Sequence, residues 1–142
     1  MSAGAPRKAP LRIGLISDTH DLLRPEALAF LAGSDRIVHA GDICSPGVLE
    51  ALAAVAPLTA VRGNNDRGAW AARLRESELV DVGGDGVDVV VSGHSHRPLV
   101  ERRDGVLFIN PGSAGPRRFS LPISVGELTI VDGAASARTV TL

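Results

Sequence analysis

Histidines and carboxylates stand at the ends of four short apolar stretches of this sequence. The four groups read Ser-Asp-Thr-His, Gly-Asp, Gly-Asn-Asn-Asp and Gly-His-Ser-His. The side chains among them that we take as metal-ligand candidates are Asp18, His20, Asp42, Asn64, His94 and His96. Carboxylate, imidazole and amide oxygen together suit Mn²⁺, Fe, Zn²⁺ or Ni²⁺, whereas Ca²⁺ prefers oxygen ligands throughout. The residue types therefore predict a transition-metal site.

Each group taken alone has a simpler explanation. A single aspartate at a strand end is more often a helix cap or a turn residue, and Asn64-Asn65 alone is typical of a turn. The pair His94 and His96 could be loop histidines that happen to be close. Four polar strand ends that fit one coordination plan are not independent, however, so we favour the metal site.

The same residues suggest a hydrolytic chemistry. One central carboxylate, Asp42, could bridge two ions about 3.5–4 Å apart, as in two-metal hydrolases. Such a pair polarises a phosphoryl group and lowers the pKa of a bridging water, and the resulting hydroxide attacks phosphorus in line. Gly41, Gly63 and Gly93 each precede a candidate ligand, and the missing Cβ would let backbone and ligand approach the ions closely.

The elements that must position these residues alternate in the first half of the chain. Apolar runs at residues 12–18, 36–42 and 57–64 predict buried strands, and residues 24–32, 45–55 and 66–78 predict helices, with Ser45 as an N-cap and Pro46 at N1. Crossovers of this length imply parallel strands. Because ligand sites form beyond the carboxyl ends of parallel strands, we expect the polar strand ends to converge at one edge.

The second half is richer in antiparallel signals. Residues 87–94 predict another buried strand, and residues 98–110 predict a hairpin that turns at Asp104-Gly105. At least two more strands are expected in residues 125–142, with a turn near Asp132-Gly133. The sequence thus predicts a mixed α/β (α+β) fold in which two sheets pack together and helices lie outside.

Composition narrows the class of protein. The chain has 142 residues, of which 44% are hydrophobic and 22% charged, and a net charge of −1, so nothing suggests a nucleic-acid-binding surface. The N-terminal stretch lacks the apolar segment of a signal peptide, and no run could span a membrane. We expect residues 1–10 to be a disordered tail and residues 11–142 to form one domain.

The single cysteine, Cys44, excludes an internal disulfide and favours a cytoplasmic setting. We expect Cys44 to have a structural role. We expect His39 to be a histidine packed in the core.

The four motifs stand in the order and spacing typical of a known family. The chain resembles the calcineurin-like metallophosphoesterases, and more narrowly the small single-domain phosphodiesterases that include the retromer subunit VPS29. The stretch Ile109 to Ser113, Ile-Asn-Pro-Gly-Ser, is typical of that subgroup too. The resemblance implies a four-layer α/β/β/α sandwich with two divalent metal ions at one edge, Mn²⁺ being our first expectation. It implies Asp18, His20, Asp42 and His96 for the first metal, and Asp42, Asn64 and His94 for the second.

One ligand of the family pattern is missing. The family has a further histidine at the end of a strand between the asparagine motif and the Gly-His-x-His motif. Only 29 residues lie between Asn64 and His94, and none of them is a histidine. We expect the corresponding strand and the following helix to be shortened or missing around Gly83 to Gly86. The second metal position is therefore expected to be weak or empty.

Two functions remain open on this evidence. The first is a metal-dependent phosphoesterase, and more narrowly a phosphodiesterase acting on a small phosphate ester. Asn65 stands where many family members carry a general-acid histidine, which favours esters with good leaving groups. The second is a catalytically weak metal-binding scaffold or protein-interaction module of VPS29 type. Neither reading involves nucleic acid or membrane, and a homo-oligomer is compatible with both.

Overall fold

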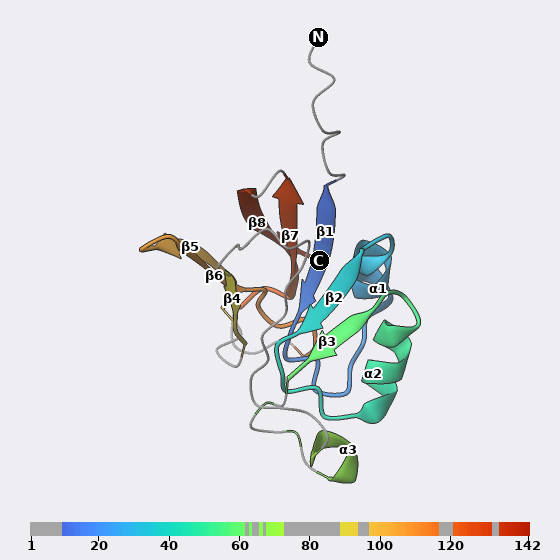
Figure 1. Ribbon diagram of the computed structural model, residues 1–142. Coiled ribbons are helices and arrows are strands. Elements are labelled where there is room, and N and C mark those ends of the chain that lie inside the picture. The colour runs from blue at the N-terminus through green and yellow to red at the C-terminus, as the bar shows by residue number, and fades with distance from the viewer. Residues whose placement is uncertain are drawn as a thin grey trace.

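Eight strands and three helices make up the described part of the computed structural model (Figure 1). The structure describes residues 10–61, 63, 66, 68–72, 89–93, 97–116, 121–131 and 134–142. In chain order the elements are β1 (Leu11–Ile16), α1 (Pro25–Leu31), β2 (Arg36–His39), α2 (Pro46–Ala53), β3 (Leu58–Ala60), α3 (Ala69–Ala72), β4 (Val89–Val91), β5 (Leu99–Arg103), β6 (Val106–Asn110), β7 (Ser124–Val131) and β8 (Ala134–Thr141).

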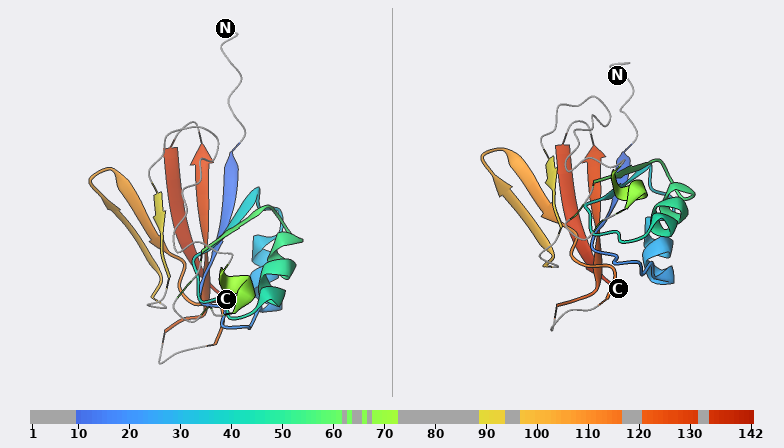
Figure 2. Two further views of the ribbon diagram at one scale, coloured as in Figure 1. Left: turned by 60° about the horizontal axis from the view of Figure 1, so that its bottom comes forward. Right: turned by 90° about the horizontal axis from the view of Figure 1, so that it is seen from below.

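The first sheet has the strand order β3-β2-β1-β7-β8. Strands β1, β2 and β3 are parallel, as the alternation of strands and helices predicted, and β7 and β8 extend the sheet as an antiparallel hairpin. Helix α2 begins as expected, with Pro46 in its first turn and Ser45 Oγ accepting a hydrogen bond from the Gly47 amide at 3.2 Å. Helices α1 and α2 cover the face of this sheet that points away from the second sheet (Figure 2).

The second sheet has the order β4-β6-β5. Strands β5 and β6 form the predicted hairpin, and both residues of its turn, Asp104 (φ 50°) and Gly105 (φ 78°), have the left-handed backbone that Asp-Gly favours. Strand β4 pairs in parallel with β6. The expectation that the valine strand shares one sheet edge with β1, β2 and β3 is therefore wrong, because β4 finds its hydrogen-bond partner in the second sheet.

Two apolar cores hold these layers together. The core between the helices and the first sheet contains Ile16, Ala27, Leu31, Ile37, Ile43, Val48, Leu52, Ala56, Ala60, Ala114 and Val125. The core between the two sheets contains Ile13, Leu15, Leu107, Ile109, Leu128 and Ile130. Strand β1 contributes to both cores, so its carboxyl end is fixed from both sides.

The described residues form three layers: helices, first sheet and second sheet (Figure 2). This confirms the predicted mixed α/β fold with two packed sheets. On the second sheet, Val90 is 44% exposed and Leu99 is 48% exposed, and no described helix covers them. The expected shortened segment, and the predicted helix beyond α3, fall in residues 73–88, which lie outside the described residues.

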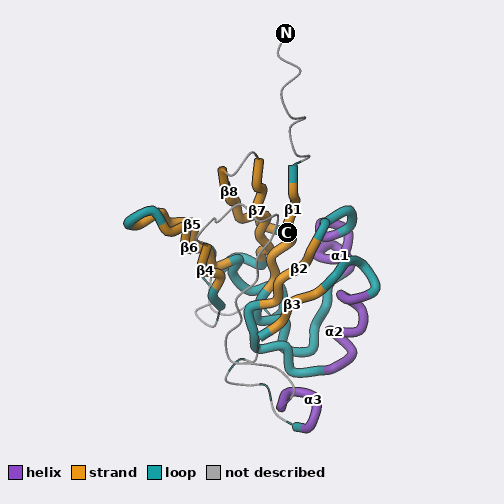
Figure 3. Tube along the Cα trace, viewed as in Figure 1, coloured by secondary structure: helices purple, strands orange, loops and turns teal. Residues whose placement is uncertain are grey.

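The loops that follow β1, β2 and β3 gather at one end of the first sheet (Figure 3). Parallel strands produce this arrangement because all their carboxyl ends point the same way. The metal-capable residues of the first two motifs lie on these loops.

Candidate metal centre

The loops after β1 and β2 run side by side and are joined by main-chain hydrogen bonds. The Asp18 amide donates to Gly41 O, and the His20 amide donates to Asp42 O, each at 3.0 Å. These bonds bring the backbone of each candidate ligand to a fixed place relative to the other loop. The side chains of Asp18, His20 and Asp42 therefore approach one another although they come from two loops.

All three of these residues have a left-handed backbone. Their φ angles are 55° for Asp18, 45° for His20 and 56° for Asp42. Such conformations are uncommon for residues with a Cβ; each costs about 1–3 kcal/mol and persists only where the surrounding structure enforces it. Three of them in one small region are typical of a functional site, where the backbone is bent to aim side chains at a common point.

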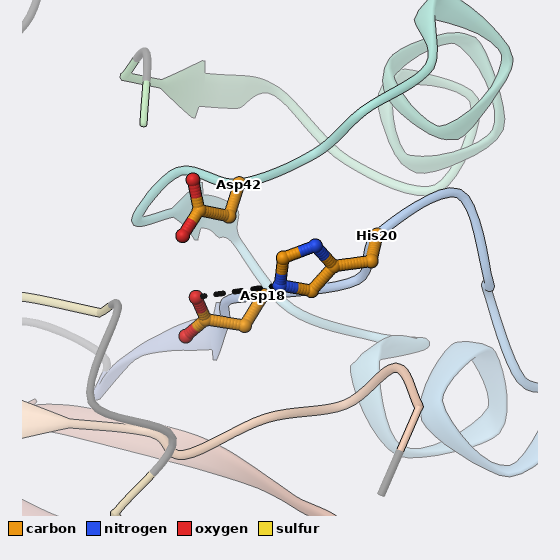
Figure 4. A group of neighbouring side chains, drawn as sticks. All are labelled: Asp18, His20 and Asp42. Atoms are coloured by element: carbon orange, nitrogen blue, oxygen red, sulfur yellow. Dashed lines mark ion pairs between the residues drawn. The ribbon is translucent and has the colours of Figure 1, made fainter. Parts of the chain in front are cut away.

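Asp18, His20 and Asp42 together offer a compact set of ligand atoms. One ligand atom from each residue lies within 4.8 Å of the others, and His20 Nε2 is 4.0 Å from Asp18 Oδ1 (Figure 4). Asp18 is fully buried and Asp42 is 1% exposed. Two carboxylates held together away from water are favoured by a nearby cation, because like charges repel strongly at low dielectric. This donor set therefore fits a divalent metal ion.

Two glycines lie directly against these carboxylates. A Cβ added at Gly63 would overlap the amide nitrogen and Oδ1 of Asp42, and a Cβ added at Gly93 would overlap Ser17 Oγ and lie 3.1 Å from Asp18 Oδ2. Gly63 directly precedes Asn64 in the sequence, and Gly93 directly precedes His94. The loop after β3 and the chain after β4 thus both reach the centre, although β4 belongs to the other sheet.

The other predicted ligands, Asn64, His94 and His96, lie outside the described residues, as does Asn65. Their roles stay predictions. Of the six candidate ligands, the structure describes Asp18, His20 and Asp42, and it places these three together.

Asp66 has a role that sequence reasoning missed. Asp66 is the last residue of the Gly-Asn-Asn-Asp motif, and its Oδ1 accepts a hydrogen bond from the Cys44 amide (2.7 Å) while its Oδ2 accepts one from the Gly63 amide (2.8 Å). The Asp66 amide also donates to Gly63 O at 3.2 Å. A signal was available, because aspartate side chains often hydrogen-bond to nearby backbone groups in turns.

His39 lies beneath the centre as a buried core residue, as the sequence predicted. Its Nδ1 accepts a hydrogen bond from the Gly41 amide (3.1 Å), so its proton is on Nε2, which lies 3.0 Å from Thr19 Oγ1. Thr19 Oγ1 in turn donates to Ile43 O. Complete burial lowers the pKa of His39 from 6.5 to about 3, and it stays neutral. The histidine is thus part of the scaffold that holds both loops.

Cys44 is in contact with one of the candidate ligands. Its Sγ lies 3.6 Å from His20 Nδ1, on the side of the ring opposite the nitrogen that faces Asp18. Burial, followed by the negative charge of Asp66, raises the pKa of the Cys44 thiol. Cys44 is therefore a neutral thiol at neutral pH, which agrees with a structural role rather than that of a nucleophile.

The loop after β6 supports the centre from the second sheet. Ser113 Oγ donates to Asp18 O at 3.1 Å, and Asn110 Nδ2 donates to Gly93 O at 3.4 Å. Asn110 Oδ1 also accepts from the Gly112 amide at 2.9 Å. The Ile-Asn-Pro-Gly-Ser stretch, taken from the sequence only as a signature, thus has a physical function, because it ties the backbones at Asp18 and Gly93 together.

Comparison with known proteins assigns the family. The sequence model of the calcineurin-like phosphoesterase superfamily domain matches residues 11–88 and 78–133. A probable metallophosphoesterase of Methanothermobacter thermautotrophicus is 37% identical over an alignment of 140 positions, which covers 78% of this chain and 81% of that protein. Another from Methanocaldococcus jannaschii is 30% identical over an alignment of 151 positions, which covers 84% of this chain and 76% of that protein. The chain belongs to the calcineurin-like phosphoesterase superfamily, which confirms the resemblance.

The family match is in two pieces that meet at residues 78–88. The departure from the family pattern that we expect around Gly83 to Gly86 falls where these two pieces overlap.

Solved structures share the fold at low sequence identity. Vacuolar protein sorting 29 from Cryptosporidium parvum has a TM-score of 0.74 and 19% identity, covering 94% of this chain and 98% of that one. An archaeal phosphodiesterase has a TM-score of 0.72 and 24% identity, covering 93% of this chain and all of that one. A phosphoesterase from E. coli has a TM-score of 0.62 and 23% identity, covering 92% of this chain and 99% of that one.

Among the described residues, no helix is both long and apolar enough to cross a membrane.

Proposed function

We propose that this protein is a metal-dependent phosphodiesterase that hydrolyses a small phosphate ester. The observation that carries the proposal is the meeting of Asp18, His20 and Asp42 at the carboxyl ends of β1 and β2. Membership of the calcineurin-like phosphoesterase superfamily supports the same chemistry. The single cysteine suits a cytoplasmic setting.

The proposed ligands follow the sequence motifs. Asp18, His20 and Asp42 would hold a first metal together with His96, and Asp42 would also serve a second metal together with Asn64 and His94. We propose Mn²⁺ as the metal, with Fe, Zn²⁺ and Ni²⁺ as alternatives that the same donor set accepts. His20 would bind through Nε2, since this nitrogen faces Asp18 while Nδ1 faces Cys44.

Divalent metal ions bound here would supply Lewis-acid polarisation of the phosphoryl group and a water molecule acidic enough to act as the nucleophile. The chain's own part is to hold the donors in place. Asp18 and Asp42 contribute two negative charges in a buried position, where they attract cations more strongly than they would in water. The left-handed backbones and the loop-to-loop hydrogen bonds keep these donors preorganised.

Protonation of the leaving group is the weak step in this proposal. An amide such as that of Asn65 cannot donate a proton near neutral pH, so it cannot replace a general-acid histidine. Substrates whose leaving group is stable as an anion, such as aryl phosphodiesters, would therefore react fastest. Activated aryl diesters are therefore the substrates to use in an assay.

The test combines metal content with hydrolysis. Purified full-length protein would be analysed for bound metals by elemental analysis and then assayed with bis(4-nitrophenyl) phosphate, with and without added Mn²⁺. We expect bound transition metal and Mn²⁺-dependent release of nitrophenol, with Asp42→Asn as the inactive variant and Asp35→Asn as the control. Asp35 is an exposed carboxylate that accepts the Arg12 amide at the start of β1, away from the centre. Metal-free protein, or hydrolysis that persists in Asp42→Asn, would contradict the proposal.

A second candidate is a metal-binding scaffold of VPS29 type with little catalysis. The observation that favours it is the missing family histidine between Asn64 and His94. On this proposal the protein binds metal in the elemental analysis but does not hydrolyse the aryl diester, so the same experiment separates the two candidates.

A further inference from the structure

We infer that Asp66 is a positioning residue for the metal centre: its carboxylate joins the loop after β2 to the loop after β3 and so holds Asp42 and His20 in place. The inference rests on the proposed metal site but not on the proposed phosphodiesterase reaction. Both carboxylate oxygens of Asp66 accept hydrogen bonds from backbone amides. Asp66 would therefore support the candidate ligands and would not bind the metal itself.

The first contact of Asp66 leads to His20. The Asp66 Oδ1 atom accepts the Cys44 amide at 2.7 Å, and the Cys44 thiol lies 3.6 Å from His20 Nδ1. Cys44 has a left-handed backbone with φ 67°, which a residue with a Cβ adopts only when its surroundings enforce it. The hydrogen bond from Asp66 is such a constraint. It keeps the thiol against the ring of His20, and a partner on Nδ1 fixes how Nε2 is aimed.

The second contact of Asp66 leads to Asp42. The Asp66 Oδ2 atom accepts the Gly63 amide at 2.8 Å, and Gly63 lies directly against the amide nitrogen and Oδ1 of Asp42. Holding Gly63 in this position limits how the Asp42 side chain can rotate. The two oxygens of one carboxylate therefore act on two candidate ligands at once.

A carboxylate suits this task better than an amide would. Asp66 is only 6% exposed, and a buried amide N–H that loses its acceptor is costly. An asparagine has one acceptor oxygen, and its NH₂ group would face the second backbone donor. Asp66→Asn should therefore keep the shape of the side chain and lose one of the two hydrogen bonds, whereas Asp66→Ala should lose both.

The experiment measures Mn²⁺ affinity without substrate. Wild type, Asp66→Asn and Asp66→Ala would be titrated with Mn²⁺ by calorimetry well below their unfolding temperatures, and their thermal unfolding would be followed in chelator. We expect Mn²⁺ affinity to fall about 10- to 100-fold, which is the usual range when a group that supports a metal ligand is removed, with alanine at the larger end. The visible spectrum of bound Co²⁺ should also change, because the ligand geometry would be disturbed.

Asp35→Asn is the matched control. Asp35 Oδ2 accepts a backbone amide at 2.8 Å, so the substitution makes the same Asp-to-Asn change at an exposed carboxylate that also bonds to the main chain, away from the centre. We expect Mn²⁺ affinity and the Co²⁺ spectrum of this variant to equal those of the wild type.

Each outcome bears on the inference. Weaker Mn²⁺ binding by the folded Asp66 variants, with Asp35→Asn unchanged, supports it. A lower unfolding temperature in chelator with unchanged Mn²⁺ affinity and an unchanged Co²⁺ spectrum would overturn it, since Asp66 would then only stabilise the fold. A wild type that binds Mn²⁺ but hydrolyses no diester overturns the proposed phosphodiesterase alone, whereas a wild type that binds no metal overturns both.

Discussion

Gly63 lies directly against Asp42, although the two residues follow different strands of the first sheet. A Cβ at Gly63 would overlap both the amide nitrogen and Oδ1 of Asp42. The contact explains why a glycine precedes the asparagine motif, because any side chain there would push the loop after β3 away from the carboxylate. It also makes the geometry of the centre sensitive to a single methyl group.

Gly63→Ala should therefore damage both stability and metal binding. Overpacking of a closely packed site costs about 1–3 kcal/mol, so we expect a loss of that size in the free energy of unfolding, together with weaker Mn²⁺ binding. Chemical denaturation in chelator measures the first effect, and calorimetric titration with Mn²⁺ measures the second.

Gly47→Ala provides the matched comparison. Gly47 is an exposed residue in the first turn of α2, and its added Cβ would meet only Ser45 Oγ, at 3.4 Å. Alanine is favoured over glycine in helices by about 0.5–1 kcal/mol, so this variant should be as stable as the wild type or slightly more stable. Equal losses in the two variants would contradict a special role for the Gly63–Asp42 contact.

Asp42→Asn should remove most of the proposed hydrolytic activity, because this carboxylate would serve both metal ions. Loss of a supporting group alone typically costs 10- to 100-fold, so we expect a loss of at least about 100-fold when a ligand itself is changed. Asn65→Ala should have a far smaller effect, because an amide cannot act as a general acid near neutral pH. Rates with bis(4-nitrophenyl) phosphate at saturating Mn²⁺ test both variants, and similar losses would show that these roles are wrongly assigned.

The two proposed metal positions should be unequal. The first has two carboxylates and two imidazoles, whereas the second has Asp42, Asn64 and His94 and lacks the family's further histidine. Fewer and weaker donors lower the affinity of a site. Bound Mn²⁺ and hydrolysis followed in one titration should show activity rising well after the first equivalent has bound. Two tight and equal sites per chain would mean that another residue replaces the missing histidine.

His39 should make the fold sensitive to acid. Its pKa is 6.5 when unfolded and about 3 when folded, so between these values the unfolded chain binds a proton that the folded chain does not. The free energy of unfolding should therefore decrease as the pH falls below 6.5, by about 1.4 kcal/mol per pH unit from this residue. Above pH 6.5 both states are neutral at His39, and this contribution no longer changes.

Denaturation in chelator at several pH values measures this dependence, and His39→Gln, whose side chain does not titrate, should show a shallower slope. Nitrogen NMR of the wild type gives an independent check, since the His39 ring should remain neutral with its proton on Nε2 at pH 5. A protonated His39 ring in the folded protein at that pH would show that the prediction is wrong.

Local signals in the sequence were sufficient for much of the fold. The apolar runs predicted β1, β2 and β3, and Asp104-Gly105 predicted the β5–β6 turn, because a strand or a tight turn depends mainly on residues that are adjacent in the chain. Parallel order then followed from the lengths of the crossovers. The same reasoning placed Asp18, His20 and Asp42 at strand ends that share one edge, where the structure has them.

Only the tertiary structure decided how distant segments meet. Strand β4 pairs with β6 in the second sheet, although its valine run alone would suit either sheet. The carboxylate of Asp66 could have been a ligand, a cap or a turn residue, and its choice of the Cys44 and Gly63 amides depends on how the loops after β2 and β3 pack. The sequence thus determined which residue types stand at the strand ends. Their partners depended on long-range packing, because hydrogen bonds and close contacts between loops are set by three-dimensional distances that local sequence patterns do not encode.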